Sequence, residues 1–447
     1  MEEYKNRYAY HFTMLDNLES IIENGLLCTN LKNQLKISHK NIASQGIQER
    51  RSNTMVTGTT NIHDYVPFYF AKKTPMLLSC VRSKNIDQQA VIYFALSLEI
   101  LEQDDNVRFT LRSANTNNMP SFYSNQNLEK LDDINWSIIE SKTWIYPEDE
   151  KQQKMAELLI PQRITIDMID HIIVWNKYIK KIIDEFFQKK DIAISVRIDQ
   201  SFDHYYSINN LSFITGPYFL YCNVKKTIEE INNNSRLNPV QREKYKFGYM
   251  SDCSCSICEA ISTVYDKCSS FLMTYNGDIN LLEHLQAVHG NLSKYDEYRS
   301  LDEQAKRVVE ISAQLHDVGK LKSRLNDKGI MNKADGDHPV KALHFLIEIF
   351  KDQTIFTADE IRMIVVLVAY HDLIGEISTK GRNKEQLTNL VEQKLITSEK
   401  EFNMLLALSY ADIEEYAVFP PFGITHAGKI TELRGDVLNK LKEIVND

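Results

Sequence analysis

The stretch AVIYFALSL, at residues 90–98, decides the fold class of the first half of the chain. Aromatic and β-branched residues fill it, which is typical of a strand buried in a sheet. A second stretch of the same character, YVPFYF, lies at residues 65–70. Upstream, NLESIIENGLL at residues 17–27 spaces its apolar side chains as a helix does, and it predicts a helix that stops at Gly25. These mixed signals predict an α+β domain over residues 1–200.

The rest of the chain has a different pattern. From about residue 279 the apolar residues keep helical spacing almost throughout, which predicts an all-α domain over residues 279–447. Between the two regions, NNNS at residues 232–235, followed by LNP at 237–239, is the clearest break in the pattern. Residues 201–278 are therefore expected to form a connector.

Length and composition bound the class of protein. A chain of 447 residues exceeds what one hydrophobic core serves, because single cores stop growing at roughly 250–300 residues. The net charge of −9 argues against sequence-blind binding of duplex DNA, which needs many cations to neutralise phosphates. The longest apolar runs, such as residues 364–369, are too short to span a membrane, and the acidic start MEE is unlike a signal peptide. We expect a cytoplasmic protein with no membrane partner.

Four segments of the first domain form a series. They are YHFTMLDNLESIIENGLL (10–27), IASQGIQERR (42–51), NIHDYVPFYFAKKTPML (61–77) and KMAELLIPQRI (154–164). In this order and at these separations they resemble the DarT family of ADP-ribosyltransferases. The resemblance covers nearly the whole first domain. It implies an ADP-ribosyltransferase-like fold that uses NAD to attach ADP-ribose to a nucleic-acid base.

The chemistry of that reaction points to particular residues. Cleavage of the bond between nicotinamide and ribose leaves positive charge on the ribose, so a fixed carboxylate is the natural stabiliser. Glu157, in the apolar setting MAELL, is the candidate for this role and for removing a proton from the attacking base. The resemblance implies that Arg51 is the catalytic arginine. It also implies contacts to NAD from His11, Thr13, Asn17, Gly25, Leu27, Arg51, Tyr65 and Phe70.

An enzyme that acts on a base needs access to its edge. This requirement favours single-stranded DNA, or another unpaired nucleic acid, over an intact duplex. The resemblance implies thymidine or guanosine as the target, and the sequence leaves that choice open. The polar loop at residues 115–127 carries Met119, Phe122 and Tyr123. It is either a substrate-reading loop or an uncommitted surface loop.

The all-α domain carries a second series of candidate residues, each on or at the end of an expected helix. The series is His284, then His316 and Asp317 in LHDVGK, then His338, His371 and Asp412. It resembles the HD superfamily of metal-dependent phosphohydrolases. The resemblance implies a first divalent metal ion on His284, His316, Asp317 and Asp412, a second completed by His338 and His371, and Lys320 facing a phosphate. Two metal ions a few ångströms apart activate water and clamp a phosphate, so the implied reaction is phosphoester hydrolysis.

Three cysteines, Cys253, Cys255 and Cys258, fall within six positions. In a reducing compartment such a cluster is typical of a zinc site rather than of disulfides. The CxCxxC pattern is similar to the zinc motif of tRNA-guanine transglycosylases, and this local resemblance implies a structural zinc ion only. His289, or else Cys268, is expected as the fourth ligand.

These features together predict a two-activity enzyme, with base ADP-ribosylation in the first domain and phosphoester hydrolysis in the last. The DarT resemblance implies a toxin–antitoxin or phage-defence setting with an antitoxin or regulatory partner, although fusion to an HD domain departs from the family's usual separate hydrolase. Two alternatives stay open. One is a phosphohydrolase whose first domain only binds nucleotide or nucleic acid. The other is a non-enzymatic adaptor that binds nucleic acid.

Overall fold

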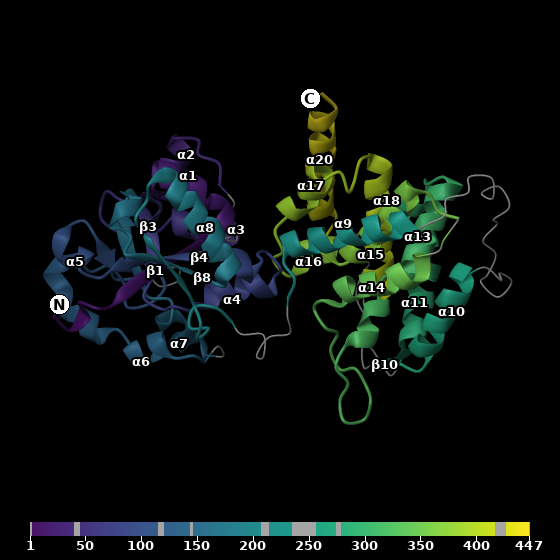
Figure 1. The fold of residues 1–447 in the computed structure, drawn as a ribbon, viewed down its shortest axis with the longest axis horizontal. Coiled ribbons are helices and arrows are strands. Elements are labelled where there is room, and N and C mark those ends of the chain that lie inside the picture. Colours follow the sequence, from purple (N-terminus) through teal and green to yellow (C-terminus); the bar gives the residue numbers. More distant parts are fainter. Residues whose placement is uncertain are drawn as a thin grey trace. The chain divides into compact units, whose positions relative to one another are not determined.

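A computed structural model provides the structure of the protein. It describes residues 2–39, 45–114, 120–143, 146–206, 214–234, 256–273, 279–351, 353, 355–415 and 426–446. The chain forms two compact units, Met1–Leu211 (unit 1) and Ser212–Asp447 (unit 2) (Figure 1). The boundary lies eleven residues beyond the expected one. The expected connector is not a separate body in the described residues, because its helices pack within unit 2.

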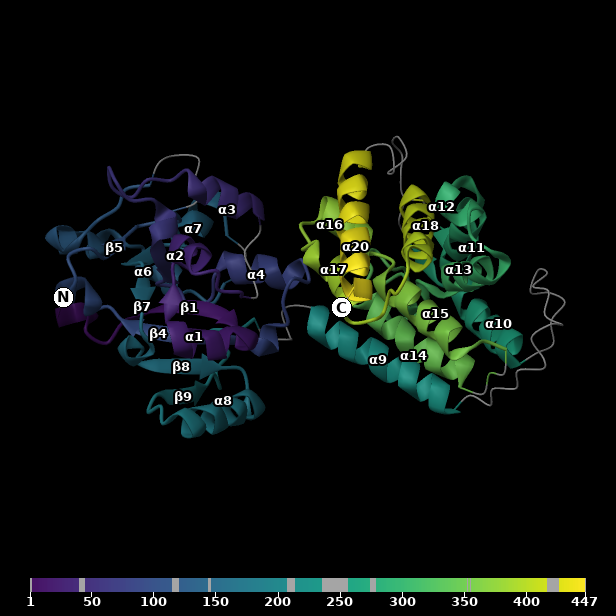
Figure 2. The ribbon, with the colours of Figure 1, turned by 90° about the horizontal axis from the view of Figure 1, so that it is seen from above.

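Unit 1 is built around a seven-stranded sheet with the strand order β5-β6-β3-β1-β4-β8-β9. In sequence order its strands are β1 (Tyr8–Met14), β3 (Tyr65–Tyr69), β4 (Val91–Ser97), β5 (Arg108–Phe109), β6 (Glu157–Pro161), β8 (His171–Val174) and β9 (Ser195–Ile198). All neighbouring pairs are antiparallel except β8 and β9, which are parallel and lie beside α8 (Lys177–Lys190) (Figure 2). The strands expected at residues 65–70 and 90–98 are thus confirmed as β3 and β4.

Shorter elements surround the sheet of unit 1. The helices are α1 (Leu18–Asn24), α2 (Thr29–Gln34), α3 (Gln45–Ser52), α4 (Pro75–Arg82), α5 (Ile100–Gln103), α6 (Trp136–Glu140), α7 (Glu148–Gln153) and α8, and β2 (Leu26–Leu27) pairs with β7 (Arg163–Ile164). Helix α1 ends before Gly25, as expected. Gly25 has a φ of 80°, and a Cβ atom there would lie 2.7 Å from the carbonyl oxygen of Ile164, so the turn requires glycine.

The face on which a side chain lies follows from the register of the strands. Tyr10 of β1 stands opposite Tyr69 of β3, and Tyr69 stands opposite Glu157 of β6. Residues directly opposite one another in a sheet share a face. Tyr10, Tyr69 and Glu157 therefore form a row across three strands on one face of the sheet.

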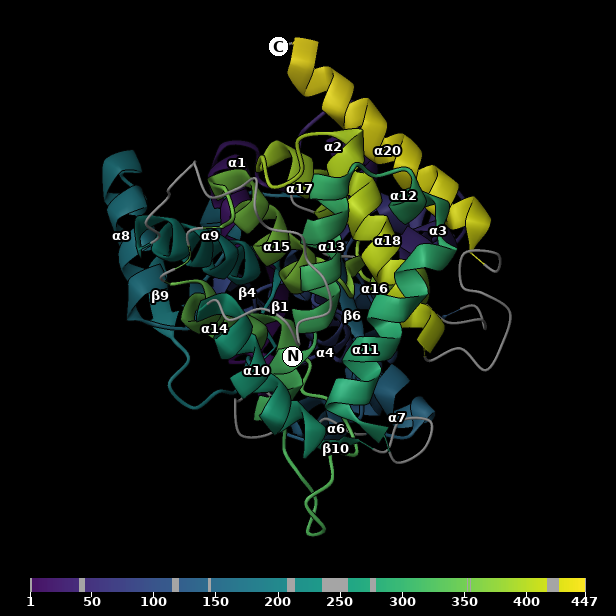
Figure 3. The ribbon, with the colours of Figure 1, turned by 90° about the vertical axis from the view of Figure 1, so that its right-hand side faces the viewer.

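Unit 2 is helical, as expected from residue 279 onward. Its elements are α9 (Pro217–Asn234), α10 (Ser256–Ser269), α11 (Leu281–Asn291), α12 (Asp296–Arg299), α13 (Glu303–Leu315), α14 (His338–Phe350), α15 (Ala358–Tyr370), α16 (Leu373–Thr379), α17 (Glu385–Glu392), α18 (Glu399–Glu415) and α20 (Ala427–Asn446), with the two-residue strands β10 (Leu272–Met273) and β11 (Ile279–Asn280). Figure 3 shows α11, α13 and α18 side by side, and these helices contact one another.

The centre of unit 2 is α15. Its residues from Met363 to Tyr370 are all buried, and α9, α13, α14 and α18 pack against it. A helix that is apolar all round needs such cover, because only a shell of neighbours removes every face from water. Among the described residues, no helix has the length and apolar character that a membrane crossing requires.

Candidate functional site

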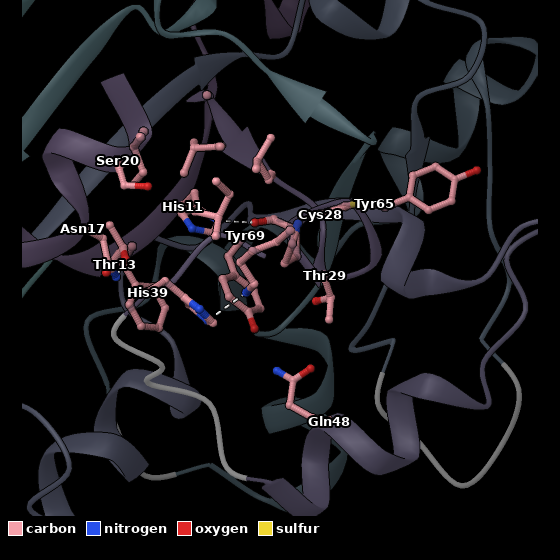
Figure 4. A pocket seen from close by; sticks show the side chains of 18 of the residues that line it. His11, Thr13, Asn17, Ser20, Cys28, Thr29, His39, Gln48, Tyr65 and Tyr69 are labelled. Atoms are coloured by element: carbon pink, nitrogen blue, oxygen red, sulfur yellow. Dashed lines mark hydrogen bonds between the residues drawn. The ribbon is translucent and has the colours of Figure 1, made fainter. Parts of the chain in front are cut away.

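A pocket in unit 1 lies where β1 and β3 separate. The two strands pair at one position, Tyr10 with Tyr69. Both strands contribute to the wall, through His11, Phe12 and Thr13 on β1 and Tyr65, Pro67 and Tyr69 on β3. Residues of α1, β2 and α2 line it as well, and Gln48 of α3 extends toward it from another side (Figure 4). The split in the sheet thus opens a site between two rigid strands.

Ionisable side chains in the pocket hold one another in place. Nδ1 of His11 lies 2.8 Å from the carbonyl oxygen of Pro67 across the split, and Nζ of Lys32 lies 2.7 Å from Nε2 of His39. Burial lowers the pKa of His11 and of Lys32, and burial together with the charge of Lys32 lowers the pKa of His39 to about 4. Both imidazoles are therefore neutral at pH 7. His11 donates to Pro67, while His39 accepts from the ammonium group of Lys32.

A buried ion pair stands close to this pocket. Arg51, on α3, donates from both terminal nitrogens to the two carboxylate oxygens of Glu157, at 3.0 Å each. Glu157 is the first residue of β6 and is 1% exposed, while Arg51 is 9% exposed. The backbone N–H of Ala114 also donates to Oε1 of Glu157, at 3.1 Å. Burial disfavours the charge of Arg51, but the adjoining carboxylate outweighs burial and raises the pKa of Arg51, so the guanidinium stays charged.

Tyr69 connects the ion pair to the pocket. Its side chain lines the pocket, and it stands opposite Glu157 in the register of β3 and β6. Neighbouring strands lie about 4.8 Å apart, so the backbone of Glu157 is one strand spacing from that of Tyr69 in the pocket wall. Burial, and then the charge of Glu157, raise the pKa of Tyr69, which keeps its phenol proton. A molecule in the pocket would therefore meet a phenol first and the Arg51–Glu157 pair beside it.

Six of the residues expected to contact NAD line this pocket: His11, Thr13, Asn17, Gly25, Leu27 and Tyr65. The amide of Asn17 donates to the hydroxyl of Thr13 at 2.9 Å, which orients both side chains. The other two, Arg51 and Phe70, are not among the lining residues. The ring of Phe70 is 3% exposed, belongs to the hydrophobic core and meets Trp136 edge-on. Phe70 instead lines a second cavity of unit 1, and its contact with NAD stays a prediction.

Among the lining residues that sequence analysis did not name as NAD contacts are Lys32, His39 and Gln48. Lys32 and His39 lie outside the four family segments, and Gln48 lies within the segment 42–51 but was not singled out, because these residues reach the pocket only through the fold. In the polar loop, Met119 lies outside the described residues, and Phe122 packs against a small core cluster. Tyr123 exchanges two backbone hydrogen bonds with Phe109. Phe122 and Tyr123 of the polar loop therefore both make structural contacts.

In unit 2 the six expected metal ligands converge from five helices. One ligand atom from each of His284, His316, Asp317 and Asp412 lies within 4.8 Å of the others, and the same holds for Asp317, His338 and His371. Asp317 belongs to both groups. Its Oδ2 lies 2.9 Å from Nε2 of His284, and its Oδ1 lies 3.0 Å from Nε2 of His338. This is the placement of a carboxylate that could bridge two cations.

The backbone orients three of these imidazoles. Nδ1 of His316, His338 and His371 lies 2.8, 2.9 and 2.8 Å from the carbonyl oxygen of the residue three positions earlier. Such contacts fix the tautomer of metal-binding histidines and leave Nε2 for the metal. Burial disfavours a charged His316, but Asp317 and Asp412 outweigh it and raise the pKa of His316 to about 10. The cluster thus attracts a cation, and its imidazole and carboxylate donors fit divalent transition-metal ions.

Two more residues of unit 2 adjoin the cluster. Asp372 lies 3.4 Å from Nε2 of His338 and forms a third group of possible ligands with His371 and Asp412. Sequence analysis missed Asp372, although the AYHD step repeats the His-Asp pair of LHDVGK. Lys320, expected to face a phosphate, is buried with its ammonium group against Asp317.

Gly319, the glycine of the LHDVGK motif, has a steric role. A Cβ atom on Gly319 would lie 1.9 Å from the carbonyl oxygen of His338. Such a distance is far below any van der Waals contact, so only glycine lets the 3-10 turn Val318–Lys322 approach α14. The close approach carries Asp317 and Lys320 to the start of α14, where His338 lies.

Most of the expected zinc knuckle lies outside the residues that the structure describes. Cys253 and Cys255 lie outside the described residues, and so does the side chain of Cys258. Of the two candidates for the fourth ligand, Cys268 is packed in the hydrophobic core, where burial raises the pKa of its thiol to about 12. His289 is partly exposed on α11. The zinc site stays a prediction.

Comparison with known proteins concerns unit 1. Residues 10–207 match the family model described as ssDNA thymidine ADP-ribosyltransferase, DarT. A DNA ADP-ribosyl transferase of Thermus sp. (strain 2.9) is 28% identical over 200 residues, covering 42% of this chain and 93% of that protein. On the family model and this relative, unit 1 is similar to DarT proteins.

Two further matches concern the same part of the chain. A DNA ADP-ribosyl transferase–DNA ADP-ribosyl glycohydrolase fusion protein of Thermosipho africanus is 21% identical over 188 residues, covering 42% of this chain and 47% of that protein. The solved structure of Thermus sp. 2.9 DarT in complex with ADP-ribosylated ssDNA is 27% identical. It covers 46% of this chain and 97% of that chain, with a TM-score of 0.41.

The ion pair of unit 1 generates a stability prediction. Glu157→Gln leaves the buried charge of Arg51 without its counter-ion, so we expect a loss of roughly 3–5 kcal/mol in the stability of unit 1. For a domain of this size that loss lowers the melting midpoint by about 10 °C, measured by calorimetry. Arg51→Met combined with Glu157→Leu should recover part of the loss.

The matched control is an exposed ion pair of the same unit. Lys180 and Asp184 lie one helical turn apart on α8, and Asp184→Asn should move the midpoint by no more than about 1 °C, because exposed pairs contribute little. Equal shifts for Glu157→Gln and Asp184→Asn would contradict a stabilising role for the buried pair.

The cluster of unit 2 generates a metal prediction. Added Mn²⁺ should raise the melting midpoint of the metal-stripped protein, because a ligand that binds only the folded state stabilises it. Asp317→Asn should abolish the shift, since it removes a charge from both ligand groups. Asp327→Asn, outside these groups, is the control. An undiminished shift in Asp317→Asn would exclude this cluster as the site.

Proposed function

We propose that unit 1 transfers ADP-ribose from NAD to a thymine base of single-stranded DNA. The observation that carries the proposal is the bidentate, buried pair of Arg51 and Glu157 next to a pocket at a split in the sheet. The family model that matches residues 10–207 supports DNA and thymidine as acceptor. The relative from Thermus, a DNA ADP-ribosyl transferase by name, supports the same reaction.

The reaction assigns a task to each part of the site. The bond between ribose C1″ and the nicotinamide nitrogen breaks, and nicotinamide leaves with the electron pair of that bond. Glu157 stabilises the positive charge that develops on the ribose. A bond then forms between C1″ and the one ring nitrogen of thymine that carries a proton, and the carboxylate of Glu157 takes up that proton.

The remaining residues bind and orient. Lys32 is the cationic lining residue of the pocket and would pair with the diphosphate of NAD, while His11, Thr13 and Asn17 offer hydrogen bonds to ribose or carboxamide groups. Arg51 holds the carboxylate of Glu157 in one orientation through two parallel hydrogen bonds. Because that geometry exists before substrate binds, it costs no rearrangement during the reaction.

A transfer assay tests the proposal. Incubation of the full chain with radiolabelled NAD and an oligonucleotide that contains thymine should label the DNA, and Glu157→Gln should lower the rate by at least about 10²–10³-fold. Glu148→Gln on α7, an exposed carboxylate, should transfer normally. An oligonucleotide without thymine should stay unlabelled if thymine is the acceptor base. Failure of the wild-type chain to label any nucleic acid would refute the proposed reaction and favour a unit that only binds its ligand.

A second activity is favoured by the cluster of unit 2. We propose that this unit is an HD-type domain that hydrolyses a phosphoester with two divalent metal ions. His284, His316 and Asp412 would hold one ion, His338 and His371 the other, with Asp317 shared between them. Bound metal ions supply an activated water and neutralise phosphate charge. Lys320 keeps the shared carboxylate in place through its buried contact.

Reciprocal variants separate the two activities. With Mn²⁺ present, the wild-type chain should hydrolyse bis(p-nitrophenyl) phosphate, and Asp317→Asn should reduce hydrolysis to background while leaving transfer to DNA unchanged. Glu157→Gln should show the reverse pattern, because the two sites lie in different units. If both variants kept full hydrolysis, the cluster of unit 2 would not be a hydrolytic site.

A further inference from the structure

A second cavity of unit 1 is larger than the pocket at the strand split, with a volume of about 800 Å³ against about 190 Å³. The two hollows share no lining residue. Its floor is formed by alternate residues of three strands: Tyr8 and Tyr10 on β1, His171 and Ile173 on β8, and Arg197 on β9. We call this cavity the sheet groove.

Strand register places the sheet groove beside the transfer site. Tyr10 of the groove stands directly opposite Tyr69, which lines the pocket, and Tyr69 stands opposite Glu157. All three therefore lie on one face of the sheet. With about 4.8 Å between neighbouring strands, Tyr10 is about 10 Å from Glu157 across the sheet. The part of the groove at Tyr10 thus lies two strands from the proposed catalytic residue Glu157.

The charge of the groove contrasts with the charge of the chain. Six cationic side chains line it, against three carboxylates: Arg7, Lys72, Lys73, Lys142, Lys154 and Arg197 against Glu140, Asp199 and Asp203. Arg7 pairs with Glu140, and Arg197 pairs with Asp170 outside the lining, so the unbalanced positive charge lies on the lysines. The whole chain carries a net charge of −9. A local cationic excess on an acidic protein is the electrostatic pattern of a site for an anion.

Two of the lysines are available to an anion. The side chains of Lys72 and Lys142 are 47% and 71% exposed, and both ammonium groups meet the carboxylate of Asp203, at 3.7 and 2.7 Å. One carboxylate thus faces two cations, which leaves a net positive charge at this end of the groove. Lys154 differs, because it is 2% exposed and donates to three carbonyl oxygens at the end of α6, so its role is structural.

A buried histidine belongs to the wall of the groove. His204 lines the groove and is 7% exposed. Its Nδ1 lies 3.5 Å from the carboxylate of Asp199, while its buried Nε2 has no hydrogen-bond partner among the described residues. Buried polar atoms nearly always have partners, so the unpartnered Nε2 of His204 is an exception in the described part of the interior. Edge contacts with Tyr10 and Tyr93, both at ring distances near 5 Å, hold the imidazole in place.

We infer that the sheet groove binds the phosphodiester backbone of single-stranded DNA next to the base that reaches Glu157, with Lys72 and Lys142 on phosphates. This inference rests on the proposed acceptor of unit 1. A row of phosphates matches the cationic rim, and the rings of Tyr8 and Tyr10 offer apolar surface to sugars or bases. The groove would hold the strand while the pocket holds NAD.

Binding without NAD tests the inference separately from transfer. Fluorescence anisotropy with a fluorescein-labelled 20-nucleotide DNA strand should show that Lys72→Ala combined with Lys142→Ala weakens binding at least about tenfold at low salt. The slope of log K against log salt should fall by about 1.4, because each lost phosphate contact on a single strand contributes about 0.7. The matched control, Lys181→Ala with Lys189→Ala on α8, removes the same charge outside the groove and should bind normally.

Kinetics give the second readout. In the transfer assay, the Lys72 and Lys142 variant should raise KM for the oligonucleotide and leave KM for NAD unchanged. Normal DNA binding and normal KM in a chain that transfers ADP-ribose would overturn the inference and leave the proposed function intact. Weakened binding in a chain without any transfer would support the groove and refute the proposed function. Equal weakening by the control pair would also overturn the inference, because it would show general charge attraction.

Discussion

The buried pairing of Arg51 with Glu157 is the interaction on which unit 1 depends. A carboxylate that is 1% exposed is unfavourable in a protein interior unless a counter-ion and hydrogen bonds compensate its desolvation. The guanidinium fork and the N–H of Ala114 provide that compensation. The same contacts connect α3 and the loop after β5 to the first residue of β6. A single compensated charge therefore fixes three segments that are far apart in the chain.

Unit 2 also buries a carboxylate, but different groups compensate its charge. Asp317 is fully buried, and the groups around it are imidazoles, one lysine and the carboxylate of Asp412. The charges of the lysine and the imidazoles hold the pKa of Asp317 well below its usual range, even though burial acts in the opposite direction. Divalent cations bind carboxylates and neutral imidazoles. A buried site that brings several of these groups together is therefore suited to such cations. The helices of unit 2 are arranged around that requirement, since five of them deliver a ligand to one point.

The face of the central sheet organises the sites of unit 1. Along β1, Tyr8 and Tyr10 turn toward the sheet groove and Phe12 toward the pocket, while across the strands Tyr10, Tyr69 and Glu157 form a row. Paired strands fix these spacings to within a few tenths of an ångström, which loops cannot do. NAD, the carboxylate and an extended anionic strand would thus be kept in register by backbone hydrogen bonds. The side chains supply only the chemistry.

The sequence by itself determined the elements and the residue types of the sites. Composition and periodicity predicted β3, β4, α1 and the helical character of unit 2, because these signals depend on residues close together in the chain. Motif order predicted Arg51, Glu157 and six ligands that do converge. Tertiary structure alone decided that Phe70 packs in the core, that residues 214–234 and 256–273 join the helical unit, and that Lys32, His39, Gln48 and Asp372 adjoin the sites. The physical reason is that burial and contact depend on which distant segments meet, and one sequence carries no local signal for that.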